Sequence, residues 1–166
     1  MERKTKGKPP RLREIFQRHN APVYFITICT LNRQPILASS HVHEAFRSYA
    51  ARGKEFGVAV GRYVIMPNHL HVFVSLDRKM TVSRWVKGLK RSLDDALRRT
   101  GHKPTALNQS KLCGFWQPGA FDHLLRNSES YQQKWHYVWQ NPVRAGLVQG
   151  PEDWPYQGEI VPIDRV

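Results

Sequence analysis

Apolar residues along the chain follow two patterns, one typical of strands and the other of helices. Runs that are rich in β-branched and aromatic residues, or that alternate apolar with polar, predict strands at 23–30, 58–66 and 67–76. Apolar residues that recur every three or four positions predict helices at 39–54, 81–100 and 128–140. The stretch 115–125 also has strand character, but Pro118 and Gly119 interrupt it, which is typical of an edge strand.

The order of these elements is strand, helix, strand, strand, helix, strand, helix. This order predicts an α+β fold of the ferredoxin-like kind, in which helices pack on an antiparallel sheet. The 166 residues fit one such domain, which we place at 21–157. Residues 1–20 contain seven basic residues and little to bury, so they form either a flexible arm that orders on phosphate or a solubilising tail. We expect an irregular path after residue 143 and a C-terminal tail at 158–166.

The predicted strand at 67–76 carries the most informative chemistry. Its alternation divides it into an apolar face with Leu70, Val72, Val74 and Leu76 and a second face with His69, His71, Phe73 and Ser75. Two imidazoles on one face of a rigid strand can bind a single divalent metal ion. The alternative is a pair of polar residues on a half-solvated strand. His41 and His43 are poor competitors, because on their predicted helix residues two apart point away from each other.

The helix predicted at 128–140 provides the second half of this chemistry. Its buried face is defined by the helical repeat of Tyr131, Trp135, Val138 and Trp139. Tyr137 lies off that face, and Asn141 follows one turn later on the same side as Tyr137. If this helix crosses the open face of the histidine strand, Asn141 can add a metal-binding oxygen and Tyr137 can attack a phosphate. The alternative for Tyr137 is a half-buried packing role.

The charge of the chain indicates a polyanionic partner. Lys and Arg number 26 against 13 Asp and Glu, which gives a formal net charge of +13. The usual polyanion for so basic a domain is nucleic acid. An anionic membrane fits less well, because the basic residues are spread over several segments rather than gathered on one amphipathic helix. No stretch of the sequence has the length and apolar character of a membrane span.

Several side chains are candidates for contacts with nucleic acid. They come from a basic stripe on the helix at 81–100, from the N-terminal segment and from the edge strand: Arg84, Lys87, Lys90, Arg91, Arg98, Arg11, Arg13 and Trp116. The stripe can track phosphates, although it can also be an ordinary solvated helix face. Trp116 is the best candidate for stacking on a base, whereas Trp135 and Trp139 are assigned to the core.

Cysteine usage and the N-terminus predict a cytoplasmic protein. Cys29 and Cys113 stand far apart and form no Cys-x-x-Cys unit, which favours a reducing compartment. The first residues lack the apolar stretch of a secretory signal.

A histidine pair that can bind a metal ion, a phenol and a basic surface together fit transesterification of a DNA phosphodiester. Tyr137 would attack phosphorus and the 3′-oxygen would leave. Because tyrosine is a poor nucleophile at neutral pH, it needs activation, which Lys134, His136 or the metal could supply. His123 and His136 could also be spare ligands or structural residues. A domain that binds structured RNA or DNA without cutting it is the alternative. A zinc hydrolase or deaminase would need a further His or Cys ligand set and a glutamate base, which the sequence lacks.

Three motifs follow one another along the chain. The first is Met66-Pro67-Asn68-His69-Leu70-His71; the second is Trp116-Gln117-Pro118 with Asp122-His123 and Leu125-Arg126-Asn127; the third runs from Tyr137 to Val148. Together they resemble the REP-associated tyrosine transposases, which are single-tyrosine HUH nucleases related to the transposases of hairpin-ended, single-stranded insertion sequences. The resemblance covers roughly residues 20–157.

This resemblance implies that His69, His71 and Asn141 bind Mg²⁺ or Mn²⁺ and that Tyr137 is a nucleophile forming a 5′-phosphotyrosine. It also implies a monomer of the bacterial cytoplasm, associated with the nucleoid. Its partner would be single-stranded DNA folded into a hairpin, an extragenic palindrome with a short guide sequence at its foot. Ala120 and Phe121 depart from the pattern, because two bulkier aromatic or basic residues are expected there.

Overall fold

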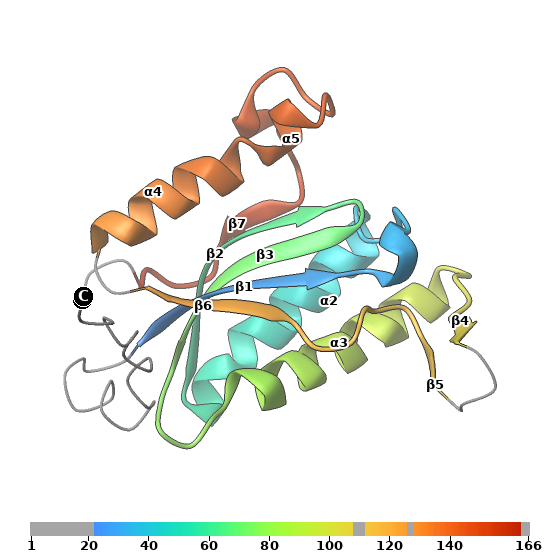
Figure 1. The fold of residues 1–166 in the computed structure, drawn as a ribbon, viewed down its shortest axis with the longest axis horizontal. Coiled ribbons are helices and arrows are strands. Elements are labelled where there is room, and N and C mark those ends of the chain that lie inside the picture. The colour runs from blue at the N-terminus through green and yellow to red at the C-terminus, as the bar shows by residue number, and fades with distance from the viewer. Residues whose placement is uncertain (1–21, 108–111, 126–127, 164–166) are drawn as a thin grey trace, which may run out of the picture.

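A five-stranded antiparallel sheet forms the centre of the computed structural model, which describes residues 22–107, 112–125 and 128–163 (Figure 1). The strand order across the sheet is β6-β1-β3-β2-β7. The strands are β1 (Val23–Cys29), β2 (Val58–Met66), β3 (His69–Leu76), β6 (Phe121–Leu125) and β7 (Gln157–Glu159). The long helices are α2 (Ser40–Ala51), α3 (Val82–Arg99) and α4 (Ser128–Trp139). The predicted ferredoxin-like α+β fold is confirmed.

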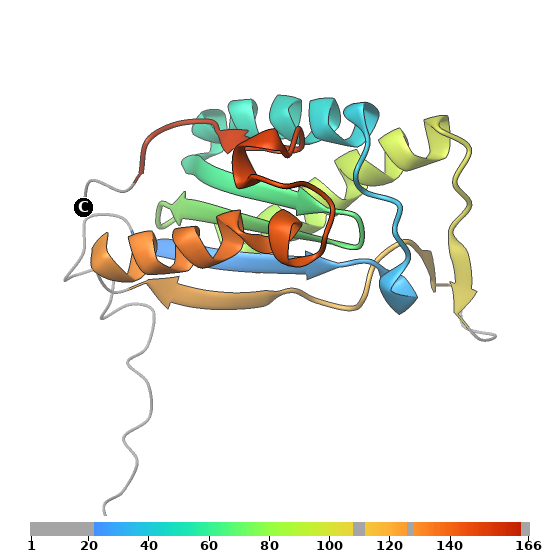
Figure 2. The same cartoon turned by 90° about the horizontal axis from the view of Figure 1, so that it is seen from above.

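Helices cover both faces of the sheet. In Figure 1, α4 lies above the sheet and α3 below it, and α2 packs beside α3. The residues of β3 that are buried on the α2 and α3 side are the predicted ones, Leu70, Val72, Val74 and Leu76. Phe73 is buried on the α4 side, in a second cluster that contains Tyr131 and Val138. Seen from above in Figure 2, α4 runs along the strands.

Short polar side chains start the two helices on the lower layer. The Ser39 hydroxyl accepts a hydrogen bond from the N–H of Val42, and the Thr81 hydroxyl accepts one from the N–H of Arg84. Such caps satisfy N–H groups that have no partner within the first helical turn. Both helices therefore begin within one residue of their predicted starts. β2 and β3 pair as an antiparallel hairpin, and His69 follows directly after its bend.

The C-terminal part is more regular than the sequence predicts. After α4, a short helix α5 (Asn141–Arg144) follows, with Pro142 in its first turn, where a missing N–H breaks no helical hydrogen bond. β7 then pairs antiparallel with β2, so the sheet extends across the boundary predicted after residue 157. Ile163 is buried in the cluster beneath α4. The sequence of β7, Gln-Gly-Glu, has no strand-like pattern, and its pairing depends on the exposed edge of β2.

β4 (Thr105–Leu107) and β5 (Leu112–Gly114) pair antiparallel between α3 and β6. They stand at one end of the molecule, away from the main sheet (Figure 2). Residues 1–20, with Arg11 and Arg13, lie outside the described part of the chain, so their role stays a prediction. Of the helices in the described ranges, none has both the length and the apolar character that crossing a membrane requires.

Candidate metal and nucleophile site

His69 and His71 lie side by side on the face of β3 that α4 partly covers. Their ring centroids are 4.7 Å apart and their planes are inclined by 80°. Both side chains are half-buried. Because β3 is the central strand, with β1 on one side and β2 on the other, hydrogen bonds on both edges fix the backbone that carries the two rings.

A hydrogen bond at Nδ1 orients each imidazole. Nδ1 of His69 lies 2.6 Å from Oδ1 of Asn68, and since an amide oxygen can only accept, the ring donates here. Nδ1 of His71 lies 2.9 Å from Oγ1 of Thr27, the residue directly opposite on β1. When Nδ1 carries the proton, the lone pair of a neutral ring is on Nε2, as in most metal-binding histidines whose second nitrogen is fixed by a partner. Both rings therefore fit the role of metal ligands.

Both imidazoles are neutral near pH 7. Burial, and after it the charge of Arg33, lowers the pKa of His69 to about 4. Burial is also the main reason that the pKa of His71 is lowered to about 3, and His69, Arg33, Lys134 and Arg144 lower it further. A metal ion binds the unprotonated ring, so protons compete little for this pair at neutral pH.

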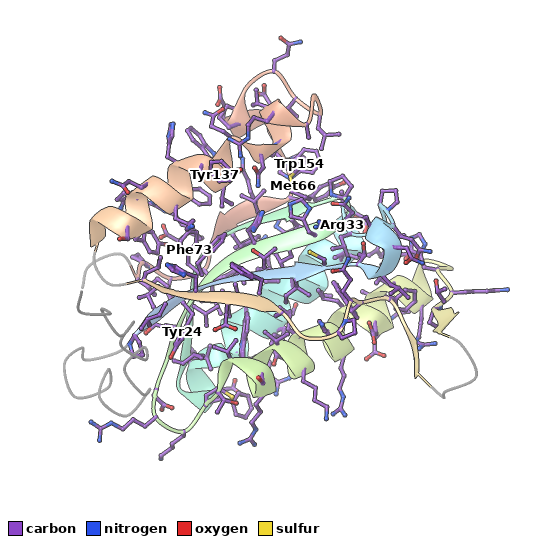
Figure 3. All side chains as sticks on the ribbon, in the orientation of Figure 1. Tyr24, Arg33, Met66, Phe73, Tyr137 and Trp154 are labelled. Atoms are coloured by element: carbon purple, nitrogen blue, oxygen red, sulfur yellow. The ribbon has the colours of Figure 1, made fainter. Side chains whose placement is uncertain are left out.

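Arg33 is placed near the histidines by an unusual turn. It ends the 3-10 helix η1 (Leu31–Arg33), in which Asn32 and Arg33 have φ angles of 52° and 55°. Positive φ is uncommon outside glycine and is retained mainly where the surrounding structure enforces it, often at functional sites. In Figure 3, Arg33 lies at the same end of the sheet as Met66, which pairs with His69 in the β2–β3 register.

Lys134 reaches the same region from α4. Its Nζ lies 5.3 Å from the centroid of the Phe25 ring, and that ring stacks on His71 with centroids 5.3 Å apart. Lys134, Arg33 and Arg144 therefore surround the histidine pair with positive charge from three different segments of the chain. An electrostatic field of this kind suits a phosphate group bound at the histidines.

Tyr137 projects from α4 into solvent. Its side chain is 62 % exposed. In Figure 3 it lies on the α4 layer, on the same side of the sheet as Phe73. It borders a groove of about 390 Å³ between α4 and β6, which Lys134 and His123 also line. The phenol is thus accessible to a nucleic-acid strand on the face that carries the histidines.

Arg144 connects Tyr137 with Asn141. Its guanidinium carbon lies 4.1 Å from the centroid of the Tyr137 ring, and its Nη2 donates a 2.6 Å hydrogen bond to the Tyr137 carbonyl oxygen. The same nitrogen donates to Oδ1 of Asn141. The oxygen that we predict as the third metal ligand is therefore held by a cation, and Arg144 has to release or share it before it can bind a metal ion.

The chemistry of the three predicted donors fits a divalent ion. Among the described residues, no three His, Cys, Asp or Glu side chains come together as a possible metal site, so a third protein ligand has to be of another type. Two imidazoles and an amide oxygen would leave coordination positions for phosphate oxygen and water. This mixture of nitrogen and oxygen suits Mn²⁺ better than Mg²⁺, which prefers oxygen alone.

The predicted basic stripe lies on the other layer of the molecule. Its exposed members on α3 are Arg84, Lys87, Arg91 and Arg98. Because α3 packs on the sheet face opposite α4, the stripe and the histidines are not brought together (Figure 1). A nucleic acid that contacted both could pass around the β6 edge of the sheet, where Lys90 of α3 contacts the segment before β6.

Lys90 and Trp116 have structural partners. Lys90 is half-buried, and its Nζ donates to the carbonyl oxygens of Gln117 (2.9 Å) and Gly119 (2.5 Å). Trp116 is only 8 % exposed, and its indole N–H donates to Asp94 at 2.5 Å. These contacts fasten the irregular segment before β6 onto α3. Because Trp116 is part of the core cluster, it exposes little surface for stacking on a base, and its stacking role stays a prediction.

In the part of the chain that the structure describes, no further histidine joins the pair to make a group of three. His41 is exposed on α2, and His43 is half-buried with its Nε2 2.9 Å from the hydroxyl of Tyr63. His136 is exposed on α4, whereas His123 faces the groove beside Tyr137.

Sequence reasoning missed two contributors to the site, Thr27 and Arg33. Thr27 is a polar residue within the apolar run of β1, which was an available signal. Arg33 has no such signal, because its position depends on the turn.

Comparison with known proteins identifies the family. The chain belongs to the transposase IS200-like family, whose model matches residues 19–141. This range contains His69, His71, Tyr137 and Asn141. The chain is 24 % identical over 139 residues to the REP-associated tyrosine transposase of Escherichia coli K12, a match that covers 80 % of this chain and 73 % of the relative.

A solved structure shares the fold. It is that of a REP-associated tyrosine transposase bound to a REP hairpin, with a TM-score of 0.60 and 23 % identity. The match covers 82 % of this chain and 75 % of the other. At this level of identity the likeness supports the architecture described above.

Proposed function

We propose that the protein is a metal-dependent endonuclease and strand transferase. Its substrate would be single-stranded DNA at the foot of a hairpin-forming extragenic palindrome, and its intermediate a 5′-phosphotyrosine. The observation that carries this proposal is the exposed Tyr137 on the helix that lies over the face with two neutral, oriented histidines. Membership of a transposase family and a net charge of +13 support DNA as the substrate. The palindrome is inferred from the relative that was solved with a REP hairpin.

Nε2 of His69, Nε2 of His71 and Oδ1 of Asn141 would hold the divalent ion. When bound, this ion would polarise a non-bridging phosphate oxygen and offset the charge that develops on it. Arg33 and Lys134 add positive charge from the protein, already in place before the reaction begins. Preorganised charge of this kind lowers the barrier because no solvent has to reorganise around the phosphate.

In the proposed reaction, the Tyr137 oxygen forms a bond to phosphorus as the bond to the 3′-oxygen breaks. The phenol proton passes to water, which reaches the exposed hydroxyl, and the departing 3′-oxygen takes a proton from water. The downstream DNA stays attached through its 5′-phosphate. Because one phosphoester replaces another, the 3′-hydroxyl of a second strand can reverse the step and join two DNA segments.

Trapping of the covalent intermediate tests this proposal. A labelled DNA hairpin with a single-stranded flank is incubated with the protein and Mn²⁺ and analysed on a denaturing gel. We expect a protein–DNA adduct with the wild type and with Tyr156→Phe, a half-buried tyrosine elsewhere, and none with Tyr137→Phe. Tyr137→Phe should still bind the hairpin. If the wild type binds DNA but forms no adduct with Mn²⁺ or Mg²⁺, the protein is a binding module and the proposal is refuted.

A further inference from the structure

Phe121 is the most exposed large apolar side chain in the described ranges, at 69 %. A single exposed apolar residue is common and needs no explanation on its own. Phe121 is distinguished by its location. It is the first residue of β6, which is an edge strand of the sheet.

The strand register places Phe121 in line with His71, the second histidine of the pair. Phe121 lies opposite Thr27 on β1, and Thr27 lies opposite His71 on β3. Residues directly opposite in antiparallel strands point to the same face of the sheet. Two strand spacings separate Phe121 from His71, roughly 10 Å. The only residue between them in this row is Thr27, a small side chain that bonds to His71.

α4 covers the next row of cross-strand neighbours, which contains Phe25 and Phe73. Phe73 packs against the ring of Tyr131 at a centroid distance of 4.4 Å, and Lys134 lies over Phe25. Phe25 and Phe73 pair with each other, one step along the strands from Thr27 and His71. Tyr131 and Trp135 of α4 are therefore engaged with Phe73, and the ring of Phe121 remains exposed.

We propose that Phe121 is a stacking platform for one unpaired base of the DNA strand whose phosphate is held at the histidines. The proposal rests on the function proposed above and adds a base-binding subsite to it. An aromatic ring beside a cluster of cations is the combination by which proteins bind single-stranded nucleic acid. Arg33 and Lys134, whose charges act on His71 in the same row, favour a polyanion over an apolar protein segment at this face. Bases in a duplex are already stacked, so the platform selects the single-stranded flank.

Fluorescence with 2-aminopurine, a base analogue that is quenched on stacking, tests the platform. The probes are a mixed-sequence single-stranded oligonucleotide with one 2-aminopurine at successive positions, and its blunt duplex. Because stacking on aromatic side chains tolerates any base, the cognate palindrome is not needed. Phe121→Leu keeps an apolar side chain but removes the ring, Phe121→Trp restores a ring, and Phe56→Leu removes another exposed ring, that of a residue 54 % exposed in η2 (Arg52–Phe56).

We expect Phe121→Leu to lose the quenching and to weaken single-strand binding by about 5- to 150-fold, the usual range for one stacked base. Duplex binding, the thermal midpoint of unfolding, Phe121→Trp and Phe56→Leu should remain near wild type. Unchanged single-strand affinity in Phe121→Leu, or an equal loss for both probes, would overturn the platform.

If the wild type forms the Tyr137 adduct while Phe121→Leu binds normally, only the platform fails. If Phe121→Leu loses single-strand binding but the wild type never forms an adduct, the platform is supported and the phosphotyrosine reaction is refuted.

Discussion

The two faces of the central sheet have the same backbone but different tasks. The face under α2 and α3 is a continuous apolar cluster, to which β3 contributes four buried aliphatic residues. On the α4 face, the same strand contributes two half-buried histidines beside one buried phenylalanine. α4 and the C-terminal segment with Trp154 and Ile163 cover this second face. The exposed side chains of Phe121 and His123 show that it stays open at the β6 edge. Stability is thus concentrated on one face, and the other can hold polar groups.

In β3, the alternation of side chains between the two faces places residues that stabilise the fold next to residues of the candidate site. Successive residues of β3 point to opposite faces, so His71 is flanked in sequence by Leu70 and Val72, both fully buried. The buried neighbours fix the position of the histidine from the opposite face, away from the nitrogen that we propose as a metal ligand. Substitutions at adjacent positions should therefore have different effects.

The largest difference is expected between Leu70→Ala and His71→Ala. Truncation of the fully buried Leu70 leaves a cavity and should lower the free energy of unfolding by about 2–5 kcal/mol. His71→Ala should abolish Mn²⁺ binding and adduct formation while lowering stability much less. Urea denaturation and calorimetric Mn²⁺ titration measure the two quantities. Equal destabilisation by both substitutions would show that the two faces are not independent.

The pH dependence of stability should come from the histidine face. The folded pKa values of about 4 and about 3 lie below the unfolded value of about 6.5, so the folded state resists protonation that the unfolded state accepts. Stability is therefore full above pH 6.5 and falls as the pH is lowered, by about 1–2 kcal/mol per imidazole at pH 5. The double variant His69→Gln with His71→Gln should have a flatter profile in urea denaturation between pH 7 and 5. If the stability of the double variant falls with pH as steeply as that of the wild type, the two histidines are not the source of the pH dependence.

Arg144 should weaken metal binding in the free protein. Its guanidinium occupies Oδ1 of Asn141 and repels a cation at the histidines. Arg144→Ala should therefore bind Mn²⁺ up to about fivefold more tightly, a modest gain because exposed charges are screened. Arg91→Ala, on the opposite layer, is the matched control and should leave Mn²⁺ affinity unchanged. Weaker Mn²⁺ binding by Arg144→Ala would indicate that Arg144 positions Asn141 for the metal instead.

The smallest effect concerns the basic stripe on α3. If the DNA passes around the β6 edge, Arg91→Ala should weaken binding slightly and reduce the slope of log affinity against log salt by about 0.9 for duplex DNA. Arg52→Ala is a suitable control, because Arg52 lies away from the stripe and pairs with Glu55 at 3.7 Å. An unchanged slope in Arg91→Ala would confine the DNA to the α4 face.

The fold and the histidine pair could be predicted because local patterns determine them. The alternation in β3, the caps Ser39 and Thr81 and the helical repeats specify elements whose order limits the topology. The role of Trp116 could not be found in this way. Its burial depends on Asp94, 22 residues away in sequence and brought close only by packing of α3 against the segment before β6.

The C-terminal part shows a second limit of sequence reasoning. β7 has no strand pattern, since its pairing partner β2 supplies the geometry. The hydrogen bond from Arg144 to Asn141 depends on the interruption between α4 and α5, which Pro142 indicates without specifying the path that follows. Exposure of Phe121 is likewise a property of the assembled sheet, because only the strand order makes β6 an edge.

Residues 156–161 run along the outer side of β2, with backbone hydrogen bonds at Ile65, Ile160 and Val161 in addition to the β7 pairing. A nine-residue strand without this cover would expose a row of unsatisfied amides and carbonyls, a template on which further copies could assemble. A truncated version that ended before Tyr156 would retain both histidines, Tyr137 and Asn141. It should nevertheless form insoluble aggregates during expression, because residues 156–161 would no longer cover the edge of β2. We therefore expect this segment to be needed for solubility and not for the proposed reaction.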